Sequence, residues 1–302
     1  MSAALLVPGQ GSQTPGFLHE LPEYSSVRET LAEASAVLGK DILELDSAEA
    51  LQSTVAVQLS LLTAGVAFAR FLESEHIALI GAAGLSVGAF TAAVAAGAIA
   101  FPDAIAFVRR RAELMETALP QGFGMGVLEG LRLTQVRELL IGTSLTIANY
   151  NSPVQFVLAG ARNEIEPLLL VALAAGAHKA QFLNMATASH THLLGDAAQE
   201  LLRFASDLPL TRASIPLLSN GTARTLTDAA AIREDLALNM ARPVRWDDML
   251  MALRSLEPRI FLEAPPGHTL TRLAQQTADD MPALAAGESR WDVLVRDAHR
   301  AG

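Results

Sequence analysis

A long stretch without charge, from Ile77 to Phe101, constrains the fold of this chain more than any other feature. The stretch is long enough to span a bilayer. Four glycines interrupt it, however: Gly81, Gly84, Gly88 and Gly97. Strands buried on both faces of a parallel sheet lose the alternation of polar and apolar residues. We therefore interpret the stretch as a buried strand (78–81), a tight turn and a helix of small residues (87–97), rather than as a membrane span.

Short apolar runs alternate with helical patterns along most of the chain. A strand is expected at Ala3 to Val7, and helical periodicity covers residues 27–38, 55–72 and 102–119. In the C-terminal part we expect a helix at 190–206, a strand at 215–219, helices at 229–238 and 246–256, a strand at 259–263, and a helix ending at Gln276. This alternation is typical of an α/β fold with a mostly parallel sheet.

The middle of the chain has a different rhythm. Strands are expected at 125–128, 145–149, 154–159 and 178–183, with helices at 133–140 and 164–175. Strand–helix–strand–strand–helix–strand is the split β-α-β, ferredoxin-like pattern. We predict an inserted small ferredoxin-like α+β subdomain at residues 122–187. The large α/β domain, with a hydrolase-like core, then comprises residues 1–121 and 188–302.

The composition limits the partners and the chemistry. The net charge is −10, from 22 basic and 32 acidic residues, which argues against nucleic acid as a partner. The absence of cysteine excludes disulfides, thiolate metal sites and cysteine nucleophiles. The N-terminal apolar run is too short for a signal peptide and lacks a positive region before it. A cytoplasmic protein without a membrane partner is the simplest expectation.

A candidate nucleophile lies inside the charge-free stretch. Gly84-Leu-Ser86-Val-Gly88 fits the Gly-x-Ser-x-Gly pattern of a nucleophile elbow, with a strand expected before it and a helix after it. The start of that helix would place backbone N–H groups where an oxyanion forms. The same residues also suit a plain turn with a capping serine.

A serine nucleophile needs a base, and other residues have to complete the site. His190 follows Ser189 where the small subdomain would return to the large domain. His190 and His192 could also form a metal pair, but no cluster of carboxylates accompanies them, so we expect no metal. Pro8-Gly-Gln10-Gly-Ser-Gln13 lacks the last glycine of a dinucleotide fingerprint, and Gln10 could instead donate to an oxyanion. An inward-pointing arginine from Arg109-Arg110-Arg111 would suit a substrate carboxylate.

These motifs together resemble those of the malonyl-CoA:acyl-carrier-protein transacylases. The resemblance covers nearly the whole chain and is carried, in order, by Pro8–Gln13, Gly84–Gly88, Arg111-x-x-x-Met115, Asn149-Tyr-Asn151 with Gln155-Phe-Val, Ser189-His190 and Pro243-Val-Arg-Trp246. Leu85 stands where that family usually has a histidine, and the stretch from Asn239 to Arg242 replaces one that contains glutamine. Both departures resemble the epsilon subunit of bacterial malonate decarboxylase, a malonyltransferase subunit.

The resemblance implies roles for individual residues. Ser86 is expected to be the nucleophile and His190 its general base, a Ser–His pair. The backbone N–H groups of Gln10 and Val87 are expected to form the oxyanion hole, and Arg111 to bind the malonyl carboxylate. The backbone carbonyl of Asn239, at the family's glutamine position, is expected to orient the histidine.

The implied reaction is transfer of malonyl from malonyl-CoA to the prosthetic-group thiol of an acyl carrier protein through a malonyl-serine. The resemblance implies no metal, nucleotide or redox cofactor, because the carrier brings the prosthetic group. In malonate decarboxylase the acceptor would be the carrier subunit, and other decarboxylase subunits would be partners. This is our first expectation for the acceptor, and a carrier protein of fatty-acid synthesis is the alternative.

Two readings of other classes remain. An α/β-hydrolase esterase would place its histidine last in the chain, which makes His268 or His299 the base. That reading gives Gln10 and Arg111 no function. A non-catalytic docking subunit of a multi-subunit complex would need none of the motif residues.

Overall fold

The core of the molecule is a six-stranded sheet built around β1 (Ser2–Val7) and β2 (Ala78–Gly84), which pair in parallel. The computed structural model describes residues 2–183, 185 and 187–300. The strand order is β10-β9-β1-β2-β7-β8, and within the described residues only the β7–β8 pair is antiparallel. The remaining strands of this sheet are β7 (Leu217–Leu218), β8 (Thr225–Leu226), β9 (Ile260–Glu263) and β10 (Ala283–Ala285). The predicted α/β fold with a mostly parallel sheet is confirmed.

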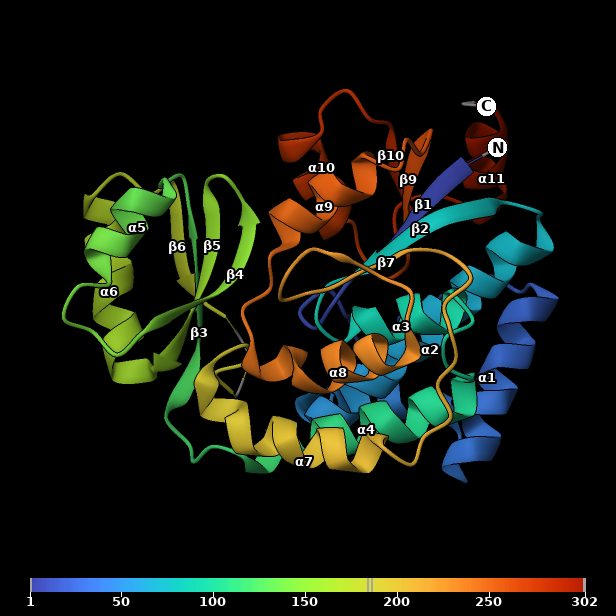
Figure 1. Ribbon diagram of the computed structural model, residues 1–302, viewed down its shortest axis with the longest axis horizontal. Coiled ribbons are helices and arrows are strands. Elements are labelled where there is room, and N and C mark those ends of the chain that lie inside the picture. The colour runs from blue at the N-terminus through green and yellow to red at the C-terminus, as the bar shows by residue number, and fades with distance from the viewer. Residues whose placement is uncertain (1, 184, 186, 301–302) are drawn as a thin grey trace.

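Helices cover both faces of this sheet, which explains its continuous apolar strands (Figure 1). In β1, Ala3, Leu5 and Val7 belong to one buried cluster, whereas Ala4 and Leu6 belong to another on the opposite face. The first cluster is completed by α1 (Ser25–Leu38), α2 (Thr54–Ser74), α3 (Gly88–Ala95), α4 (Phe101–Thr117), α7 (Gly195–Ala205), α8 (Ala229–Leu238) and α11 (Trp291–Arg300). The second is completed by α9 (Trp246–Arg254) and α10 (Thr269–Thr277).

Helix α2 is the one helix in the described part of the chain that is long and apolar enough to cross a membrane. Its most apolar stretch is 89% buried inside the structure, where it packs against α1, α3 and α4. Its apolar character is therefore accounted for by its place in the core. The charge-free stretch discussed above forms β2, the turn after it, α3 and the start of α4. The cytoplasmic location stays a prediction.

A second, four-stranded sheet lies to one side of the first (Figure 1). Its order is β4-β5-β3-β6 and all its pairs are antiparallel, the arrangement of a split β-α-β unit. Its elements are β3 (Phe123–Glu129), α5 (Leu133–Leu139), β4 (Thr146–Ser152), β5 (Gln155–Ala161), α6 (Arg162–Ala174) and β6 (Lys179–Phe182). Residues 184 and 186, near the expected end of the subdomain, lie outside the described residues, and the exact division into domains stays a prediction.

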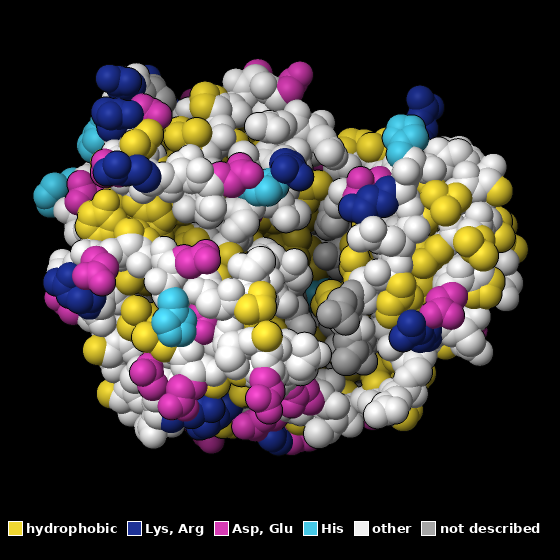
Figure 2. Space-filling view, turned by 180° about the vertical axis from the view of Figure 1, so that it is seen from behind, with side chains coloured by type: hydrophobic (Ala, Val, Ile, Leu, Met, Phe, Trp, Pro, Cys, Tyr) yellow, Lys and Arg dark blue, Asp and Glu magenta, His cyan; other side chains and the backbone are white. Residues whose placement is uncertain are grey.

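The two faces of this second sheet have different surroundings. Helices α5 and α6 pack on one face over a buried apolar cluster that includes Val136 and Ile165. The other face carries Met125, Val127 and Val157, which face the first sheet and line a pocket between the two parts. The surface is hollowed there (Figure 2). The small sheet therefore supplies one wall of a cleft whose other wall is the C-terminal edge of the parallel sheet.

The structure differs from the expected elements in one place that matters for the site. A helix was expected to begin at His190, but the regular helix α7 begins at Gly195, after a short 3₁₀ turn η3 (His192–Leu194). His190 has a left-handed backbone, with φ of 63°, and its N–H donates to the carbonyl of Met240 at 2.7 Å. This conformation cannot continue a right-handed helix. His190 is therefore held in a turn.

Candidate active site

The turn between β2 and α3 places Ser86 in the wall of the cleft. Ser86 has φ of 56°, a left-handed conformation that is uncommon for a residue with a side chain. A Cβ atom on Gly84 would lie 2.0 Å from the carbonyl carbon of Gly88, and one on Gly88 would lie 2.4 Å from the carbonyl oxygen of Val7. Both glycines are therefore required by the close approach of strand and helix. The turn has the geometry of a nucleophile elbow.

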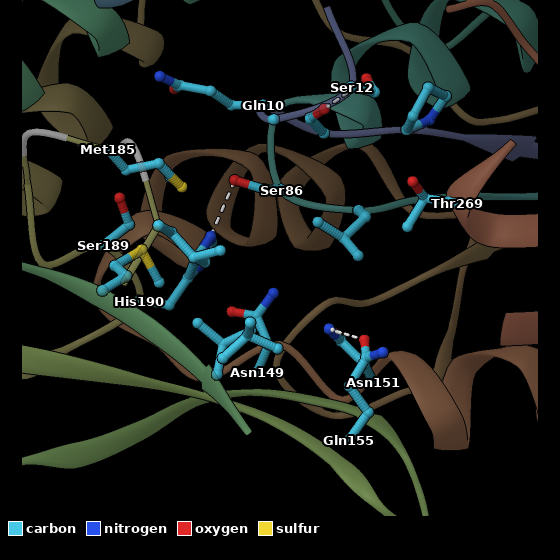
Figure 3. A pocket seen from close by; sticks show the side chains of 18 of the residues that line it. Gln10, Ser12, Ser86, Asn149, Asn151, Gln155, Met185, Ser189, His190 and Thr269 are labelled. Carbon is cyan, nitrogen blue, oxygen red and sulfur yellow. Dashed lines mark hydrogen bonds between the residues drawn. The ribbon is translucent and has the colours of Figure 1, made fainter. Parts of the chain in front are cut away.

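His190 lies against this serine, although 104 residues separate them in the chain. Its Nε2 atom is 2.8 Å from the Ser86 hydroxyl, as Figure 3 shows. Its Nδ1 atom is 2.7 Å from the carbonyl oxygen of Asn239 and 3.2 Å from that of Arg242. A carbonyl can only accept a hydrogen bond, so Nδ1 carries the proton and Nε2 presents a lone pair to Ser86. Burial is the main cause that lowers the pKa of His190 from 6.5 to about 4, and the charge of Arg111 is the second cause. The imidazole is therefore neutral and able to accept a proton.

Arg111 on α4 is completely buried and points at the serine. Its Nη1 donates to Gln58 at 2.7 Å, and its Nη2 donates to the hydroxyl of Ser86 at 3.0 Å and to Oδ1 of Asn239 at 3.2 Å. Among the described residues no carboxylate pairs with it, and its Nε has no partner. Burial lowers the pKa of Arg111 to about 9. A buried cation without a counter-ion in the described part of the structure is placed to receive a carboxylate.

The neighbouring arginines point away from the serine. Arg110 pairs with Glu200 and Glu113 on the surface, and Arg109 lies 4.0 Å from Glu113. The helical spacing of about 100° per residue accounts for this difference. Of the three consecutive arginines, Arg111 is therefore the one that the fold brings to the site.

Gln10 and Val87 lie on the two loops that meet at the serine. Gln10 lines the pocket in the turn after β1, and Val87 is the first residue after Ser86, at the start of α3. Within the described residues their backbone N–H groups have no hydrogen-bond partner. Leu85 packs against the first loop, since a Cβ on Gly9 would lie 2.8 Å from its Cδ2 atom. The two donors are thus present, and their assignment to an oxyanion hole stays a prediction.

Asn239 makes more contacts than its predicted backbone contact with the histidine. Its carbonyl accepts from His190, its Oδ1 accepts from Arg111, and its Nδ2 donates to the carbonyl of Ser86 at 3.3 Å. Asn239 is 1% exposed, so these contacts are shielded from water. One residue therefore links the base, the buried cation and the elbow.

Sequence reasoning missed two polar residues that support the site. Gln58 lies in the apolar helix α2 and holds Arg111, and its Nε2 is 3.4 Å from the sulfur of Met115. Asn220, just after β7, binds the elbow backbone through its side-chain amide. Gln58 could have been found in the sequence, because it is a polar residue within the apolar face of a helical stretch. No local pattern marks Asn220.

The pocket between the two sheets has a volume of about 490 Å³. Ser86, His190 and Gln10 line one side of it, and amide side chains from the small sheet face them across it (Figure 3). Asn149 and Asn151 are 7% and 8% exposed, and the Oδ1 atom of each has no partner in the described part of the structure. The pocket therefore offers two amide oxygens to a ligand.

The other histidines considered from the sequence are not at the serine. His192 is exposed in η3, His268 pairs with Glu288, and His299 lies in α11. Within the described residues, His190, and neither of the two esterase-type candidates, is hydrogen-bonded to Ser86. No group of three or more histidine, aspartate or glutamate side chains suited to a metal occurs among the described residues.

Comparisons with known proteins identify the family of the chain. A family model described as "Acyl transferase domain" matches residues 5–295. The chain is 35% identical over 297 residues to the malonyl CoA-acyl carrier protein transacylase of Salmonella typhimurium, covering 94% of this chain and 96% of that protein. It is 32% identical to the Bacillus subtilis protein of the same name, covering 94% and 93%.

Solved structures give the same result. The acyl-carrier-protein S-malonyltransferase of Burkholderia pseudomallei has a TM-score of 0.92 at 33% identity, covering 98% of this chain and 100% of that one. A malonyl-transacylase in complex with an acyl carrier protein of a type II polyketide synthase has a TM-score of 0.92 at 32% identity, with 100% of both chains covered. The chain belongs to the acyl transferase domain family.

Proposed function

We propose that this protein transfers a malonyl group from malonyl-CoA to the thiol of a carrier protein's prosthetic arm. The observation that carries the proposal is the buried guanidinium of Arg111, which has no carboxylate partner in the described part of the chain and touches the hydroxyl of Ser86. A dicarboxylic half-thioester places a free carboxylate close to its reacting carbonyl. An acyl group without that carboxylate would leave the buried cation unpaired. The relatives named above are malonyl transferases, which supports the same substrate.

The first half-reaction acylates the serine. His190 accepts the proton of Ser86 on Nε2, and Oγ attacks the thioester carbonyl of malonyl-CoA. The backbone N–H groups of Gln10 and Val87 would stabilise the oxyanion that forms. The carbon–sulfur bond then breaks, and His190 gives its proton to the departing CoA thiolate. The product is a malonyl ester on Ser86.

The second half-reaction reverses these steps with a different thiol. The thiol of the carrier's arm gives its proton to His190, and its sulfur attacks the ester carbonyl. The carbon–oxygen bond breaks, and the proton returns from His190 to Oγ of Ser86. Because His190 is neutral at rest, it can accept a proton from either the serine or the thiol. Every proton therefore passes through one nitrogen atom.

The walls of the pocket support a long, amide-bearing arm as the shared part of donor and acceptor. CoA and a phosphopantetheine-type prosthetic group both carry two amide bonds and end in a thiol. The unpartnered Oδ1 atoms of Asn149 and Asn151 can accept from such amides, and Met125 and Val127 supply apolar contacts. A single pocket could thus receive first CoA and then the carrier's arm.

For the physiological acceptor, the comparisons favour the alternative over our first expectation. The relatives are named as acyl carrier protein transacylases, which supports an acyl carrier protein of the fatty-acid synthesis type. The malonate decarboxylase carrier, with its phosphoribosyl-dephospho-CoA arm, is the second candidate. Leu85 and Asn239, the two departures from the usual family pattern, favour it. Measuring kcat/KM for transfer to each purified holo-carrier separates the two.

Mass spectrometry of the intact protein after brief incubation with malonyl-CoA tests the activity itself. We expect a mass increase of one malonyl group, located on the peptide that contains Ser86. The third reading, a non-catalytic docking subunit, predicts no adduct. The complete arrangement of Ser86, His190 and Arg111 supports the catalytic reading.

A further inference from the structure

The side chain of Asn220 completes a sheet pairing that the backbone leaves unfinished. In the main sheet, β2 pairs in parallel with the short strand β7, where Ala82 lies opposite Leu217. Beyond Ser219 the chain turns away, so among the described residues no strand continues beside β2 on that side as far as the elbow. On the other side β1 still pairs with it, because Leu85 donates to the carbonyl of Val7 at 2.9 Å.

The amide of Asn220 occupies the vacant position. Its Nδ2 donates to the carbonyl of Gly84 at 2.9 Å, and its Oδ1 accepts the N–H of Ser86 at 2.8 Å. In a parallel pair, one residue bonds in this way, through its own N–H and C=O, to the two residues that flank the residue opposite to it. The side-chain amide of Asn220 therefore takes the place of a strand residue opposite Leu85. It extends the ladder of β2 up to the strained serine.

Asn220 is itself rigidly held. Its backbone N–H donates to Oδ2 of Asp235 at 3.3 Å, and its carbonyl accepts from the N–H of Arg245 at 2.8 Å. The neighbouring Ser219 hydroxyl donates to the other oxygen of Asp235 at 2.5 Å. Asn220 is 0% exposed, so no water competes for these bonds. The amide is thus fixed to α8 through Asp235 and to the start of α9 through Arg245.

We infer that Asn220 is a positioning residue for the nucleophile. A serine in the left-handed region persists only where the surroundings hold it there. The Ser86 N–H that Asn220 binds belongs to the same residue as the reacting hydroxyl, and it directly precedes the N–H of Val87 that is assigned to the oxyanion hole. Asn220 does not line the pocket, so it would affect the chemistry and not substrate binding. The inference rests on the proposed role of Ser86 as nucleophile.

Labelling of Ser86 by phenylmethylsulfonyl fluoride tests the inference independently of malonyl recognition. The hydroxyl oxygen attacks sulfur, fluoride leaves, and the proton goes to His190 and then to solvent. The labelling rate is measured by mass spectrometry for the wild type, Asn220→Ala and Asn220→Asp. The aspartate variant keeps an acceptor for the Ser86 N–H but, when ionised, cannot donate to Gly84. Thermal melting identifies which variants are folded at the assay temperature.

We expect Asn220→Ala to lose about 10²-fold in labelling rate, the effect of a misplaced reacting group. The labelling rate of Asn220→Asp should lie between those of the alanine variant and the wild type. If the alanine variant does not fold, the aspartate variant alone tests the inference. With malonyl-CoA, kcat should fall while KM stays near the wild-type value. Undiminished labelling in either folded variant, or a loss that appears only in KM, would overturn the inference.

Thr30→Ala is the matched control. Thr30 is a completely buried polar residue whose hydroxyl bonds to the carbonyl of Ser26 and accepts from Arg70, away from the elbow. We expect lower thermal stability but an unchanged labelling rate. An equal loss of labelling rate in this variant would show that the effect of Asn220→Ala comes from lower stability in general. If the wild type is labelled at Ser86 but forms no malonyl adduct, the proposed function fails while the Asn220 inference is still tested.

Discussion

Arg111 donates a hydrogen bond from Nη2 to the hydroxyl of Ser86 at 3.0 Å, and the same hydroxyl lies 2.8 Å from Nε2 of His190. The buried cation and the neutral base therefore meet at one oxygen atom. A malonyl carboxylate bound by Arg111 would have its reacting carbonyl next to that oxygen.

Ser86→Ala should abolish the malonyl adduct and leave the fold intact. The change removes only a hydroxyl, and Gly84 and Gly88, which permit the close strand–helix contact, are untouched. Mass spectrometry and thermal melting measure the two effects. Transfer at the wild-type rate by the alanine variant would remove Ser86 from the mechanism.

His190→Ala should slow acylation by about 10²–10⁴-fold, the usual contribution of a general base. The structure places no second histidine on the serine among the described residues, so His192→Ala and His268→Ala should retain near wild-type rates. Single-turnover kinetics with malonyl-CoA gives the comparison. Equal losses at His190 and His268 would instead favour the esterase-type order of residues.

Arg111→Ala should weaken malonyl transfer by about 2–5 kcal/mol, the cost of breaking a buried charge pair. Transfer of acetyl should change far less, because acetyl has no carboxylate to bind. Arg111→Lys should recover only part of the loss, since a lysine offers a point charge in place of a planar fork.

The measurement is the ratio of malonyl to acetyl kcat/KM. Arg110→Ala is the control, because Arg110 lies on the surface with Glu113 and Glu200. A ratio that collapses in the Arg110 variant but survives in the Arg111 variant would show that the wrong arginine has been assigned.

The pH dependence of acylation should lack the acid limb expected of an ordinary histidine. Burial and the charge of Arg111 lower the pKa of His190 to about 4, and only the neutral imidazole accepts the serine proton. Activity should therefore fall as the pH drops through about 4 and should not fall between pH 7 and 5. A kcat/KM profile with brief exposure to each pH checks this, and a half-maximal point near 6.5 would contradict it.

Asn239→Ala should separate the two functions of that residue. The backbone carbonyl that accepts from His190 is retained, so the base stays oriented. The side-chain acceptor for Arg111 is lost, and a hydrogen bond to a charged group contributes about 1.5–3 kcal/mol. Malonyl selectivity over acetyl should drop within that range, and Asn239→Gln should restore part of it. A change in the pH profile without a change in selectivity would reverse this assignment.

The sequence was sufficient to predict strands β1, β2, β7 and β9 of the main sheet and the three residues whose side chains meet at the serine hydroxyl. Continuous apolar strands between helical segments are visible in the sequence because both faces of the sheet are covered, as the two clusters on β1 show. Ser86 could be found because an elbow needs Gly84 and Gly88 at fixed spacing. His190 and Arg111 were found through a family resemblance, and the structure brings both to within 3.0 Å of the serine hydroxyl.

Other features depend on the three-dimensional structure alone. The left-handed turn at His190 is fixed by a hydrogen bond to the carbonyl of Met240, fifty residues further along the chain. No local sequence pattern therefore predicts it. The contacts of Asn220 depend on β7 lying beside β2, which follows from the strand order and not from sequence neighbours. The short strands β8 and β10 have too few residues to show an alternation.

The residues of the small antiparallel sheet lie between α4 and His190 in the chain. They contribute none of the groups assigned to the reacting atoms. Its helix-free face supplies only the far wall of the pocket, through side chains such as Val127 and Asn149. A lineage can therefore exchange or reshape residues 123–182 to accept a different thiol-bearing arm while the acylation chemistry is inherited unchanged. Recognition of the carrier's arm and the acylation chemistry therefore reside in different parts of the fold, and the residues of each part can change at different rates.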